Sequence, residues 1–261
     1  MRFSPFQRGS RGGRAQSTGK VAVVTGAAAG LGAVYATRLA ELGHDVAVCD
    51  LESPDATVRA IRATGARAFG ACADACSPED VKAFADGVRR ELGPVEILVN
   101  NVGISPFTPF EEITLEEWRR VMTVNLDSLL LMTQAFLPDM KAAAWGRIVN
   151  VTSLMAWDAQ SKDVVHYVTS KSGVLGFTRS LASEVGVHGI TVNAICPGII
   201  RTPVLDERLP AERWERYLER QAIKQIAEPR DLLAALTMLV SPESGFITAV
   251  NVPVHGGRVW A

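Results

Sequence analysis

Short runs of Val, Ile and Ala alternate with longer segments of helical periodicity from Lys20 to the end of this 261-residue chain. Such alternation is typical of repeated βαβ units, which build a parallel sheet. The apolar runs are nearly continuous, as expected for strands that helices cover on both faces. The sequence therefore predicts an α/β fold, with a single doubly wound domain and a seven-stranded parallel sheet.

The positions of the elements follow from this alternation. Strands are predicted at 20–25, 45–49, 67–72, 95–99, 147–152, 190–195 and 246–252. Helices are predicted at about 30–43, 54–64, 78–92, 114–144 with an interruption, 163–186 and 229–241. The polar segment 202–228, which contains Trp214 and Tyr217, breaks the alternation after the sixth strand. Since open α/β sheets bind ligands at their carboxyl edge, this segment is a candidate substrate lid, with an ordinary pair of surface helices as the alternative.

Charge is unevenly distributed along the chain. The first 20 residues contain five of the 27 basic side chains and none of the 28 acidic ones. Residues 1–19 are predicted to be a basic, flexible leader or, alternatively, a transit peptide, and residues 20–261 the folded domain. The net acidic remainder offers no basic face for nucleic acid, and no apolar run approaches the about 20 residues that cross a bilayer. We therefore expect a small-molecule partner, and neither a nucleic-acid nor a membrane partner.

Four cysteines, Cys49, Cys72, Cys76 and Cys196, are too few and too scattered for a disulfide framework in a chain of this size. This usage fits a reducing compartment, so we expect a cytoplasmic location. Cys72 and Cys76 lie four residues apart, but no His or Cys pair completes a metal site with them. We expect no metal ion and interpret both as packing residues.

Glycines mark the turn after the first predicted strand, in the sequence TGAAAGLG at 25–32. They let the backbone bend sharply and approach a pyrophosphate, which the N-terminus of the next helix stabilises through free N–H groups and its dipole. A glycine triplet alone is weak evidence, but its place between a strand and a helix is that of a dinucleotide-binding Rossmann fold. The predicted cofactor-binding residues of this turn are Thr25, Gly26, Gly30, Leu31 and Gly32.

Asp50 closes the second predicted strand, about 20 residues after the glycine turn. A carboxylate at this place can accept hydrogen bonds from an adenosine ribose but repels a 2′-phosphate. No Arg or Lys lies within the glycine turn or directly after Asp50 to compensate that repulsion. The sequence therefore predicts NAD as the cofactor in preference to NADP. Glu52 is a second candidate for the ribose contact, or a solvated side chain.

Tyr167 precedes Lys171 by four residues within a predicted helix, so the two side chains lie on one face. A free phenol, with a pKa of about 10, is a poor base at neutral pH, but a neighbouring ammonium favours its ionised form. Alone, such a pair is more often an ordinary surface Tyr and Lys. Ser153 follows the fifth predicted strand directly, which places its hydroxyl at the same edge, where it can donate to a substrate oxygen. Thr152 is the nearest alternative for that role.

Taken in order, these features resemble the short-chain dehydrogenases/reductases over residues 20–258. The matching markers are TGAAAGLG at 25–32, Asp74, the NNVG sequence at 100–103, Asn125, Ser153, the YVTSK sequence at 167–171, and Pro197-Gly198. The resemblance implies a Rossmann-fold oxidoreductase with a nicotinamide cofactor. It also implies a symmetric oligomer, because the relatives are mostly homotetramers.

The resemblance further implies individual roles. The catalytic set is Asn125, Ser153, Tyr167 and Lys171. Asn125 lies within a long predicted helix, where an Asn usually faces solvent, but the resemblance implies that its backbone binds a water linking Lys171 to solvent. Both Tyr167 and Lys171 are also implied to contact the cofactor. The remaining implied cofactor contacts are Asp74 with adenine, Asn100 and Gly103 on the adenosine side, and Pro197, Gly198, Ile200 and Thr202 at the nicotinamide carboxamide.

Some positions depart from the family pattern. Val102 replaces the usual Ala of its motif, for which we expect a packing adjustment. The spacing from Ser153 to Tyr167 is one residue longer than expected, which predicts a longer loop over the site. Ala249 stands where the family has Gly, and His255 where it has Asp; His255 is interpreted as a turn or interface residue rather than a catalyst.

The predicted reaction is the interconversion of a secondary alcohol and a ketone with NAD, with Tyr167 as the general acid/base. Within the family, the 103–147 stretch looks most like NAD-dependent 1-phenylethanol dehydrogenases. Aromatic and apolar residues such as Trp157 and Met155 would suit a hydrophobic alcohol as substrate. The alternative is that these residues pack in the core. A 3-oxoacyl-thioester reductase is the alternative enzyme. A nucleotide-sensing regulator without turnover is the alternative of another class.

Overall fold

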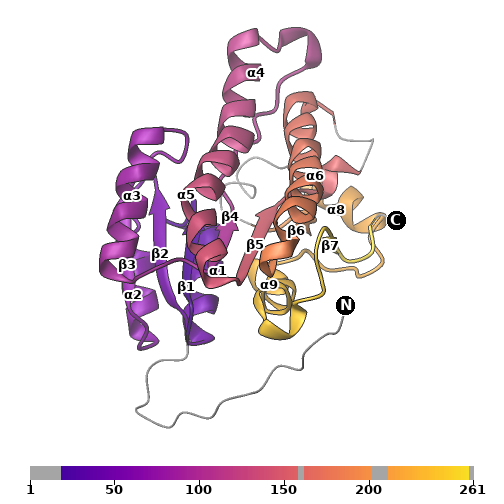
Figure 1. The fold of residues 1–261 in the computed structure, drawn as a ribbon. Coiled ribbons are helices and arrows are strands. Elements are labelled where there is room, and N and C mark those ends of the chain that lie inside the picture. The colour runs from indigo at the N-terminus through magenta and orange to yellow at the C-terminus, as the bar shows by residue number, and fades with distance from the viewer. Residues whose placement is uncertain (1–18, 158–161, 202–210, 259–261) are drawn as a thin grey trace, which may run out of the picture.

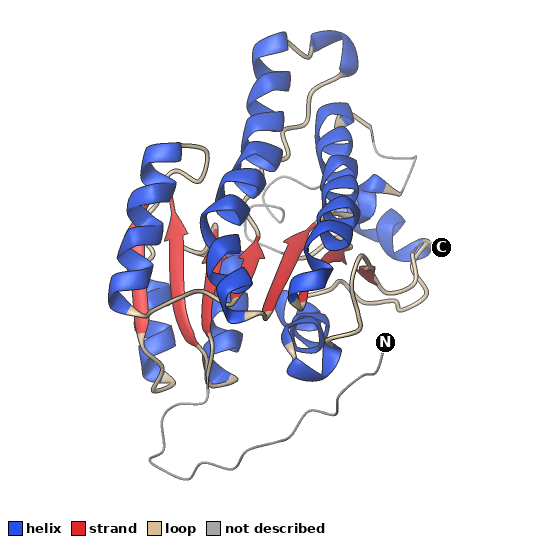
Figure 2. Cartoon of the chain, viewed as in Figure 1, coloured by secondary structure: helices blue, strands red, loops and turns tan. Residues whose placement is uncertain are grey.

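The computed structural model describes residues 19–157, 162–201 and 211–258. Within them, one sheet has the strand order β3-β2-β1-β4-β5-β6-β7, and every adjacent pair is parallel (Figures 1 and 2). The strands are β1 (Val21–Thr25), β2 (Asp45–Asp50), β3 (Ala68–Cys72), β4 (Ile97–Asn100), β5 (Gly146–Val151), β6 (Ile190–Pro197) and β7 (Asn251–Val254). The predicted seven-stranded parallel sheet is confirmed.

Helices cover both faces of the sheet (Figure 2). The described α-helices are α1 (Gly30–Glu41), α2 (Asp55–Ala63), α3 (Pro78–Glu91), α4 (Leu115–Met122), α5 (Ser128–Ala143), α6 (Val165–Val185), α8 (Ala211–Glu219) and α9 (Leu233–Val240). Val24 and Val46 point into one core with residues of α1, α2 and α9, whereas their neighbours Val23 and Ala47 point into a second core with α3, α5 and α6. Because successive strand residues face opposite sides, each strand needs apolar residues throughout, which explains the continuous runs in the sequence.

The strand order reverses between β1 and β4. These two strands are neighbours in the sheet, although β2 and β3 separate them in the sequence. The chain leaves β1 toward one side and β4 toward the other, so the loops at their carboxyl ends diverge. Open α/β sheets bind their ligands at such a reversal. The fold therefore brings the glycine turn after β1 and the NNVG segment after β4 to the same edge.

A π-helical segment, Thr123–Asp127, joins α4 to α5. The interruption predicted within 114–144 is this wide turn rather than a break in the helix. Single π-turns inside α-helices are frequent at functional sites. Asn125 lies at its centre.

The predicted seventh strand, 246–252, is misplaced, since the strand covers Asn251–Val254. Ala249 has a left-handed backbone (φ 62), which an extended strand does not allow. The segment before it still contacts β6, because Ala249 N–H donates to Val192 O at 2.8 Å and Thr248 Oγ1 accepts from Val192 N–H at 3.0 Å. This is the position where the family has a glycine, the residue that adopts such a conformation without strain.

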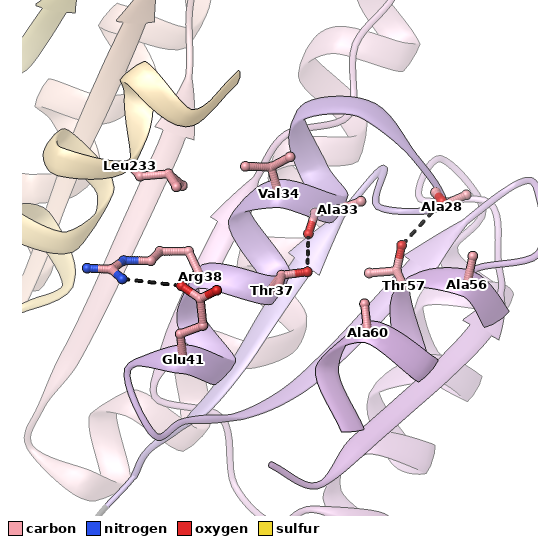
Figure 3. A pocket seen from close by; sticks show the side chains of 10 residues that line it. All are labelled: Ala28, Ala33, Val34, Thr37, Arg38, Glu41, Ala56, Thr57, Ala60 and Leu233. Carbon is pink, nitrogen blue, oxygen red and sulfur yellow. Dashed lines mark hydrogen bonds and ion pairs between the residues drawn. The ribbon is translucent and has the colours of Figure 1, made fainter. Parts of the chain in front are cut away.

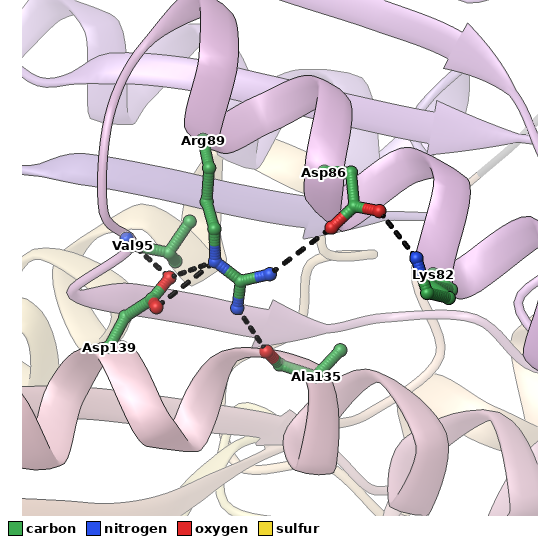
Figure 4. A network of polar contacts seen from close by, with 6 residues as sticks. All are labelled: Lys82, Asp86, Arg89, Val95, Ala135 and Asp139. Atoms are coloured by element: carbon green, nitrogen blue, oxygen red, sulfur yellow. Dashed lines mark hydrogen bonds and ion pairs between the residues drawn. The ribbon is translucent and has the colours of Figure 1, made fainter.

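An ion pair joins helices α3 and α5, which cover the second core (Figure 4). Arg89 Nε donates to Asp139 Oδ2 at 3.0 Å, and the same carboxylate oxygen accepts from Val95 N–H at 3.1 Å. Another nitrogen of Arg89 donates to the Ala135 carbonyl. The contacts fix α3, α5 and the turn before β4 relative to one another.

Among the described helices, none combines the length and the apolar character needed to cross a membrane. In the same part of the chain, no group of three or more His, Cys, Asp or Glu side chains is arranged to hold a metal ion. Cys76 is half-buried, with its thiol 3.7 Å from Thr123 O, whereas Cys72 is exposed. The interpretation of Cys72 as a packing residue is therefore wrong.

Candidate active site

Side chains from two segments, the loop after β5 and the first part of α6, meet beyond the carboxyl end of β5. Ser153 follows β5 and is 9% exposed, and its hydroxyl hydrogen-bonds with that of Tyr167 on α6. Lys171 lies one turn further along α6, is buried, and donates from Nζ to Val151 O at 2.9 Å. Its Nζ is 5.9 Å from the centre of the Tyr167 ring. The structure thus brings these three predicted residues together.

Burial changes the proton affinity of both members of the Tyr-Lys pair. Desolvation raises the pKa of Tyr167 above its ordinary value, and the hydrogen bond with Ser153 acts in the opposite direction. Desolvation lowers the pKa of Lys171 to about 8. Desolvation is the larger of the two influences on the pKa of Tyr167, and the hydrogen bond with Ser153 partly offsets it.

Asn125 is buried, so the alternative of a solvent-facing Asn is wrong. Its Oδ1 accepts from Ile104 N–H at 2.8 Å, and its Nδ2 donates to Ile104 O at 3.0 Å and to Ser170 Oγ at 2.9 Å. Ser170 in turn donates to the Tyr167 carbonyl at 2.7 Å. Asn125 therefore joins the π-helical segment, the loop after β4 and α6. A Cβ at Gly103 would lie 3.3 Å from Asn125 Oδ1 and 3.0 Å from Lys171 Nζ, which places Gly103 between the two.

The glycine turn has the shape that a pyrophosphate requires. Gly30 begins α1 with a left-handed backbone (φ 59), and a Cβ on it would meet no atom within 4 Å. Gly32 is tightly enclosed, because a Cβ there would collide with the Gly26 carbonyl oxygen. Helix α1 has neither a side-chain cap nor an acidic residue in its first turn, so its leading N–H groups remain available for an anion. The residues present therefore fit a dinucleotide, while Leu31 packs against the core beneath the turn.

Asp50 lies at the end of β2, beside the glycine turn, as predicted. Its Oδ2 accepts from Ala28 N–H at 2.9 Å, and its Oδ1 accepts from Glu52 N–H at 3.3 Å. Asp74 lies at the same edge after β3, where its carboxylate accepts from Cys76 N–H at 2.8 Å. Both carboxylates are thus held by backbone donors at the end where the adenosine of a dinucleotide would lie.

Two neighbouring asparagines after β4 have different surroundings. Asn100 is buried, and its Nδ2 donates to Asn150 Oδ1 at 2.9 Å and to Thr133 Oγ1 at 3.2 Å. Its side chain is thus committed to a network inside the fold, so any cofactor contact would have to come from its backbone. Asn101 instead donates from Nδ2 to Gly26 O at 2.9 Å and Thr25 O at 3.1 Å. Sequence reasoning did not single out Asn101, although its place in the NNVG motif was the available signal.

Thr25, the last residue of β1, makes further contacts between the glycine turn and the NNVG segment. Its hydroxyl accepts from the backbone N–H groups of Asn101 at 3.0 Å and Val102 at 3.2 Å. Thr25 therefore links the ends of β1 and β4 on either side of the strand-order reversal. These hydrogen bonds hold the glycine turn against the loop after β4.

The segment after β6 also lies at the carboxyl edge of the sheet. Gly198 N–H donates to Val254 O at 2.9 Å, and Ile199 N–H donates to the Tyr217 hydroxyl at 2.7 Å. Ile200 is buried and pairs with Ala227. Pro197 ends β6, and Thr202 lies outside the described residues.

Part of the candidate lid, 202–228, is described. Helix α8 contacts the segment after β6 through the Tyr217 hydroxyl, and the guanidinium carbon of Arg258 lies over the Tyr217 ring, 3.8 Å from its centre. The first part of the lid, 202–210, and residues 158–161 of the lengthened loop lie outside the described residues. His255 lies at the bend before Gly256, where its Nδ1 accepts from Arg258 N–H at 3.2 Å.

A shallow groove between α1 and α2 lies on the outer side of the glycine turn (Figure 3). At one end of the groove, on the right in Figure 3, Thr57 donates to Ala28 O at 3.2 Å, and at the other end Arg38 and Glu41 form an exposed ion pair. The groove contains none of the predicted catalytic or cofactor-binding residues. The groove is therefore separate from the candidate active site.

Comparison with known proteins agrees with this geometry. The model of the short chain dehydrogenase family matches residues 20–213, so the chain belongs to this family. The short-chain reductase protein NovJ of Streptomyces niveus is 38% identical, with 94% of this chain and 95% of NovJ covered. The cis-4-hydroxycyclohexanecarboxylate dehydrogenase of Sinomonas cyclohexanicum is 37% identical, with 91% and 96% covered.

A solved structure from Agrobacterium tumefaciens, a candidate 2-deoxy-d-gluconate 3-dehydrogenase with NADP bound, is also similar to this chain. Its TM-score is 0.84 at 34% identity, with 92% of this chain and 96% of that one covered. The family and the relatives make the protein an oxidoreductase that uses a nicotinamide cofactor and acts on alcohol or ketone groups. They leave open which of the two nicotinamide dinucleotides it prefers.

Proposed function

We propose that the protein is an NAD-dependent dehydrogenase that interconverts a secondary alcohol and the corresponding ketone. The observation that carries this proposal is the meeting of Ser153, Tyr167 and Lys171 at the same sheet edge as the glycine turn. A bound nicotinamide dinucleotide would accept the hydride from the alcohol carbon in one direction and supply it in the other. The protein has to hold the substrate oxygen and move its proton.

Ser153 and Tyr167 divide these two tasks. Because their hydroxyls are hydrogen-bonded to each other, a substrate oxygen between them can accept from Ser153 and exchange its proton with Tyr167. In oxidation, Tyr167 removes the proton of the substrate hydroxyl. The C–H bond of the carbon that carries this hydroxyl breaks, and its hydride passes to the nicotinamide. The products are the ketone, the reduced dinucleotide and one proton. Reduction uses the same groups in reverse.

Lys171 and Asn125 have supporting roles in this proposal. A protonated Lys171 favours the ionised phenol, because each buried charge is less costly beside one of opposite sign. Lys171 also binds the ribose of the cofactor. The backbone of Asn125 holds a water through which the proton passes to solvent, and the buried Asn125 side chain supports this role by fixing the π-helical segment against α6.

The preference for NAD is proposed from Asp50. Its carboxylate lies 2.9 Å from Ala28 N, within the glycine turn, where a 2′-phosphate would be repelled. Asp74, the backbone of Asn100, and Gly103 are proposed for the adenosine side. The nicotinamide end would contact Pro197, Gly198, Ile200 and Thr202. A cytoplasmic homotetramer completes the proposal.

A 3-oxoacyl-thioester reductase and a nucleotide-sensing regulator are the competing functions. The former usually prefers NADPH, which Asp50 disfavours. The latter would be expected to have lost part of the catalytic set, whereas all four side chains are present. The residues therefore favour a dehydrogenase of secondary alcohols.

The test is a screen of the full-length protein against aryl, polyol, steroid and thioester classes of alcohols and ketones, each with NAD(H) and with NADP(H). Formation or loss of the reduced dinucleotide is followed by fluorescence. We expect turnover of at least one secondary alcohol or ketone, with NAD(H) preferred. Turnover confined to 3-oxoacyl thioesters with NADPH would support the competing enzyme. Dinucleotide binding without turnover in any class would support the regulator.

A further inference from the structure

Three side chains outside the predicted catalytic set form a series of hydrogen bonds that ends at the backbone N–H of Tyr167. His166 is buried at the start of α6, with an exposed fraction of 0%. Its Nε2 lies 2.9 Å from Glu117 Oε1 on α4, and its Nδ1 accepts from Tyr167 N–H at 2.9 Å. Thr108, in the loop after β4, donates from its hydroxyl to the same Glu117 oxygen at 2.6 Å. This series of hydrogen bonds therefore connects α4, that loop and the first turn of α6.

These contacts define the tautomer of His166. Since Nδ1 accepts a hydrogen bond from a backbone N–H, it carries no proton, and the proton of a neutral imidazole must be on Nε2. Nε2–H then donates to the Glu117 carboxylate. Hydrogen bonds from Thr108 and His166 hold the pKa of Glu117 below its usual value, so that carboxylate stays ionised as an acceptor. Glu117 and Tyr167 N–H thus select the same tautomer from opposite sides of the ring.

The imidazole of His166 supplies a hydrogen-bond acceptor that the first turn of α6 otherwise lacks. Tyr167 is the third residue of the helix, where a backbone N–H has no acceptor within the helix. The usual solution is an oxygen on the side chain that precedes the helix, but Val164 has none. His166 supplies the acceptor from within the helix instead.

The approach to α6 is constrained at the same point. Asp163 has a left-handed backbone (φ 63), and its carbonyl accepts from Thr108 N–H at 2.8 Å. Thr108 therefore holds both Asp163, through its backbone, and Glu117, through its hydroxyl. The turn that places Tyr167 depends on contacts that converge on the His166–Glu117 pair.

We propose that His166, oriented by Glu117, is a positioning residue that fixes the first turn of α6 and thereby the hydroxyl of Tyr167. The inference rests on the proposed proton transfer by Tyr167 and adds what keeps that phenol in place. Proton transfer requires hydrogen-bond distances, and a misplacement of about 1 Å at a reacting group costs on the order of 10²-fold in rate. Loss of the Nδ1 acceptor should therefore lower kcat and leave substrate binding nearly unchanged.

Two amide substitutions distinguish the hydrogen bond of His166 Nδ1 with Tyr167 N–H from that of Nε2 with Glu117. In His166→Asn, the amide oxygen can occupy the place of Nδ1 and accept from Tyr167 N–H, but the side chain is too short to reach Glu117. In His166→Gln, the longer amide can reach Glu117 but leaves Tyr167 N–H without its acceptor. We expect kcat of His166→Asn within about threefold of wild type and kcat of His166→Gln lower by about 10- to 100-fold, with KM of both within about twofold.

Thr169→Val provides the matched control on the same helical turn. The Thr169 hydroxyl donates to Val165 O at 2.8 Å on the exposed side of α6, so its loss should change neither kcat nor KM. Thermal melting of every variant checks that it is folded. Equal kcat values in His166→Asn and His166→Gln, whether both retained or both lost, would overturn the proposal, as would an equal loss in Thr169→Val.

A measurement on the unaltered protein tests the inference without turnover. Nitrogen-15 spectra of histidine-labelled protein at pH 8 report the tautomer of each ring, and substitution of His44, His188 and His255 in turn assigns the His166 signals. We expect a neutral His166 ring with its proton on Nε2. A proton on Nδ1, or a doubly protonated ring, would overturn the inference. If the activity screen fails for every alcohol while this tautomer is found, the proposed function fails and the placement of Tyr167 by His166 stands.

Discussion

At the residue scale, the predicted acid/base pair consists of the half-buried Tyr167 and the buried Lys171, and desolvation opposes the charged form of each. The pKa of Tyr167 is raised, and that of Lys171 is lowered to about 8. A charged pair costs less than either charge alone, so proton loss from Tyr167 is favoured when Lys171 holds its proton. Ser153 contributes separately, through a hydrogen bond that favours the ionised phenol. The proposed proton transfer therefore depends on all three groups rather than on the Tyr-Lys spacing alone.

The proposed preference for NAD can be tested at a single residue. Asp50→Ala removes the carboxylate that lies against the glycine turn and should narrow the preference for NAD over NADP. The ratio of kcat/KM with the two dinucleotides measures the effect. Asp55→Ala is the matched control, because it removes an equal charge at the start of α2. An unchanged ratio in Asp50→Ala would remove Asp50 from the discrimination.

At the element scale, the helices are joined by side chains of very different burial. Asp139 joins α5 to α3 and to the turn before β4, and its side chain is 13% exposed (Figure 4). Asp86 pairs with Lys82 on the outer surface of α3, where both side chains are more than half exposed. Water competes with the second pair but largely not with the first.

Removal of these two carboxylates should therefore have different consequences. Asp139→Ala leaves Arg89 Nε and Val95 N–H without their acceptor and should lower the free energy of unfolding by about 1–3 kcal/mol. Asp86→Ala should leave it unchanged within the precision of urea denaturation. Neither should alter kcat, since the partners of both carboxylates lie on α3 and in the turn before β4. Equal effects of the two substitutions would contradict this account of the α3–α5 contact.

How far the sequence predicts each element depends on where the deciding interaction lies. The strands and the catalytic markers follow from local pattern, so the sheet and the meeting of Ser153, Tyr167 and Lys171 were foreseen. The π-helical turn was not, because it depends on Asn125 bonds to Ile104 and Ser170, which are distant in sequence. The first residue of β7 was misplaced because the conformation of Ala249 is set by its contact with β6.

At the scale of the whole molecule, titration of the buried Lys171 makes stability depend on pH. The pKa of Lys171 is about 8 when folded and 10.5 by its ordinary value. Between these two values, the unfolded chain binds a proton that the folded chain does not. Stability contributed by this group therefore increases as pH rises from about 8 to 10.5, by up to about 1.4 kcal/mol for each unit of pKa difference.

Comparison of wild type with Lys171→Met isolates this effect. The buried Tyr35 and Cys49, whose pKa values burial raises, reduce stability at high pH in both proteins, so they cancel in the difference. We expect wild type to gain free energy of unfolding relative to Lys171→Met across this interval, as measured by urea denaturation at several pH values. A constant difference between the two proteins would show that Lys171 is not perturbed in this direction.

The central claim is that Tyr167 moves the proton. The most direct test is kcat of Tyr167→Phe, measured together with NADH binding by fluorescence, with Tyr35→Phe as the control for loss of a buried hydroxyl. The account predicts that Tyr167→Phe binds NADH as wild type does and loses kcat by about 10²- to 10⁴-fold, while Tyr35→Phe retains it. A Tyr167→Phe variant with the kcat of wild type would contradict the account.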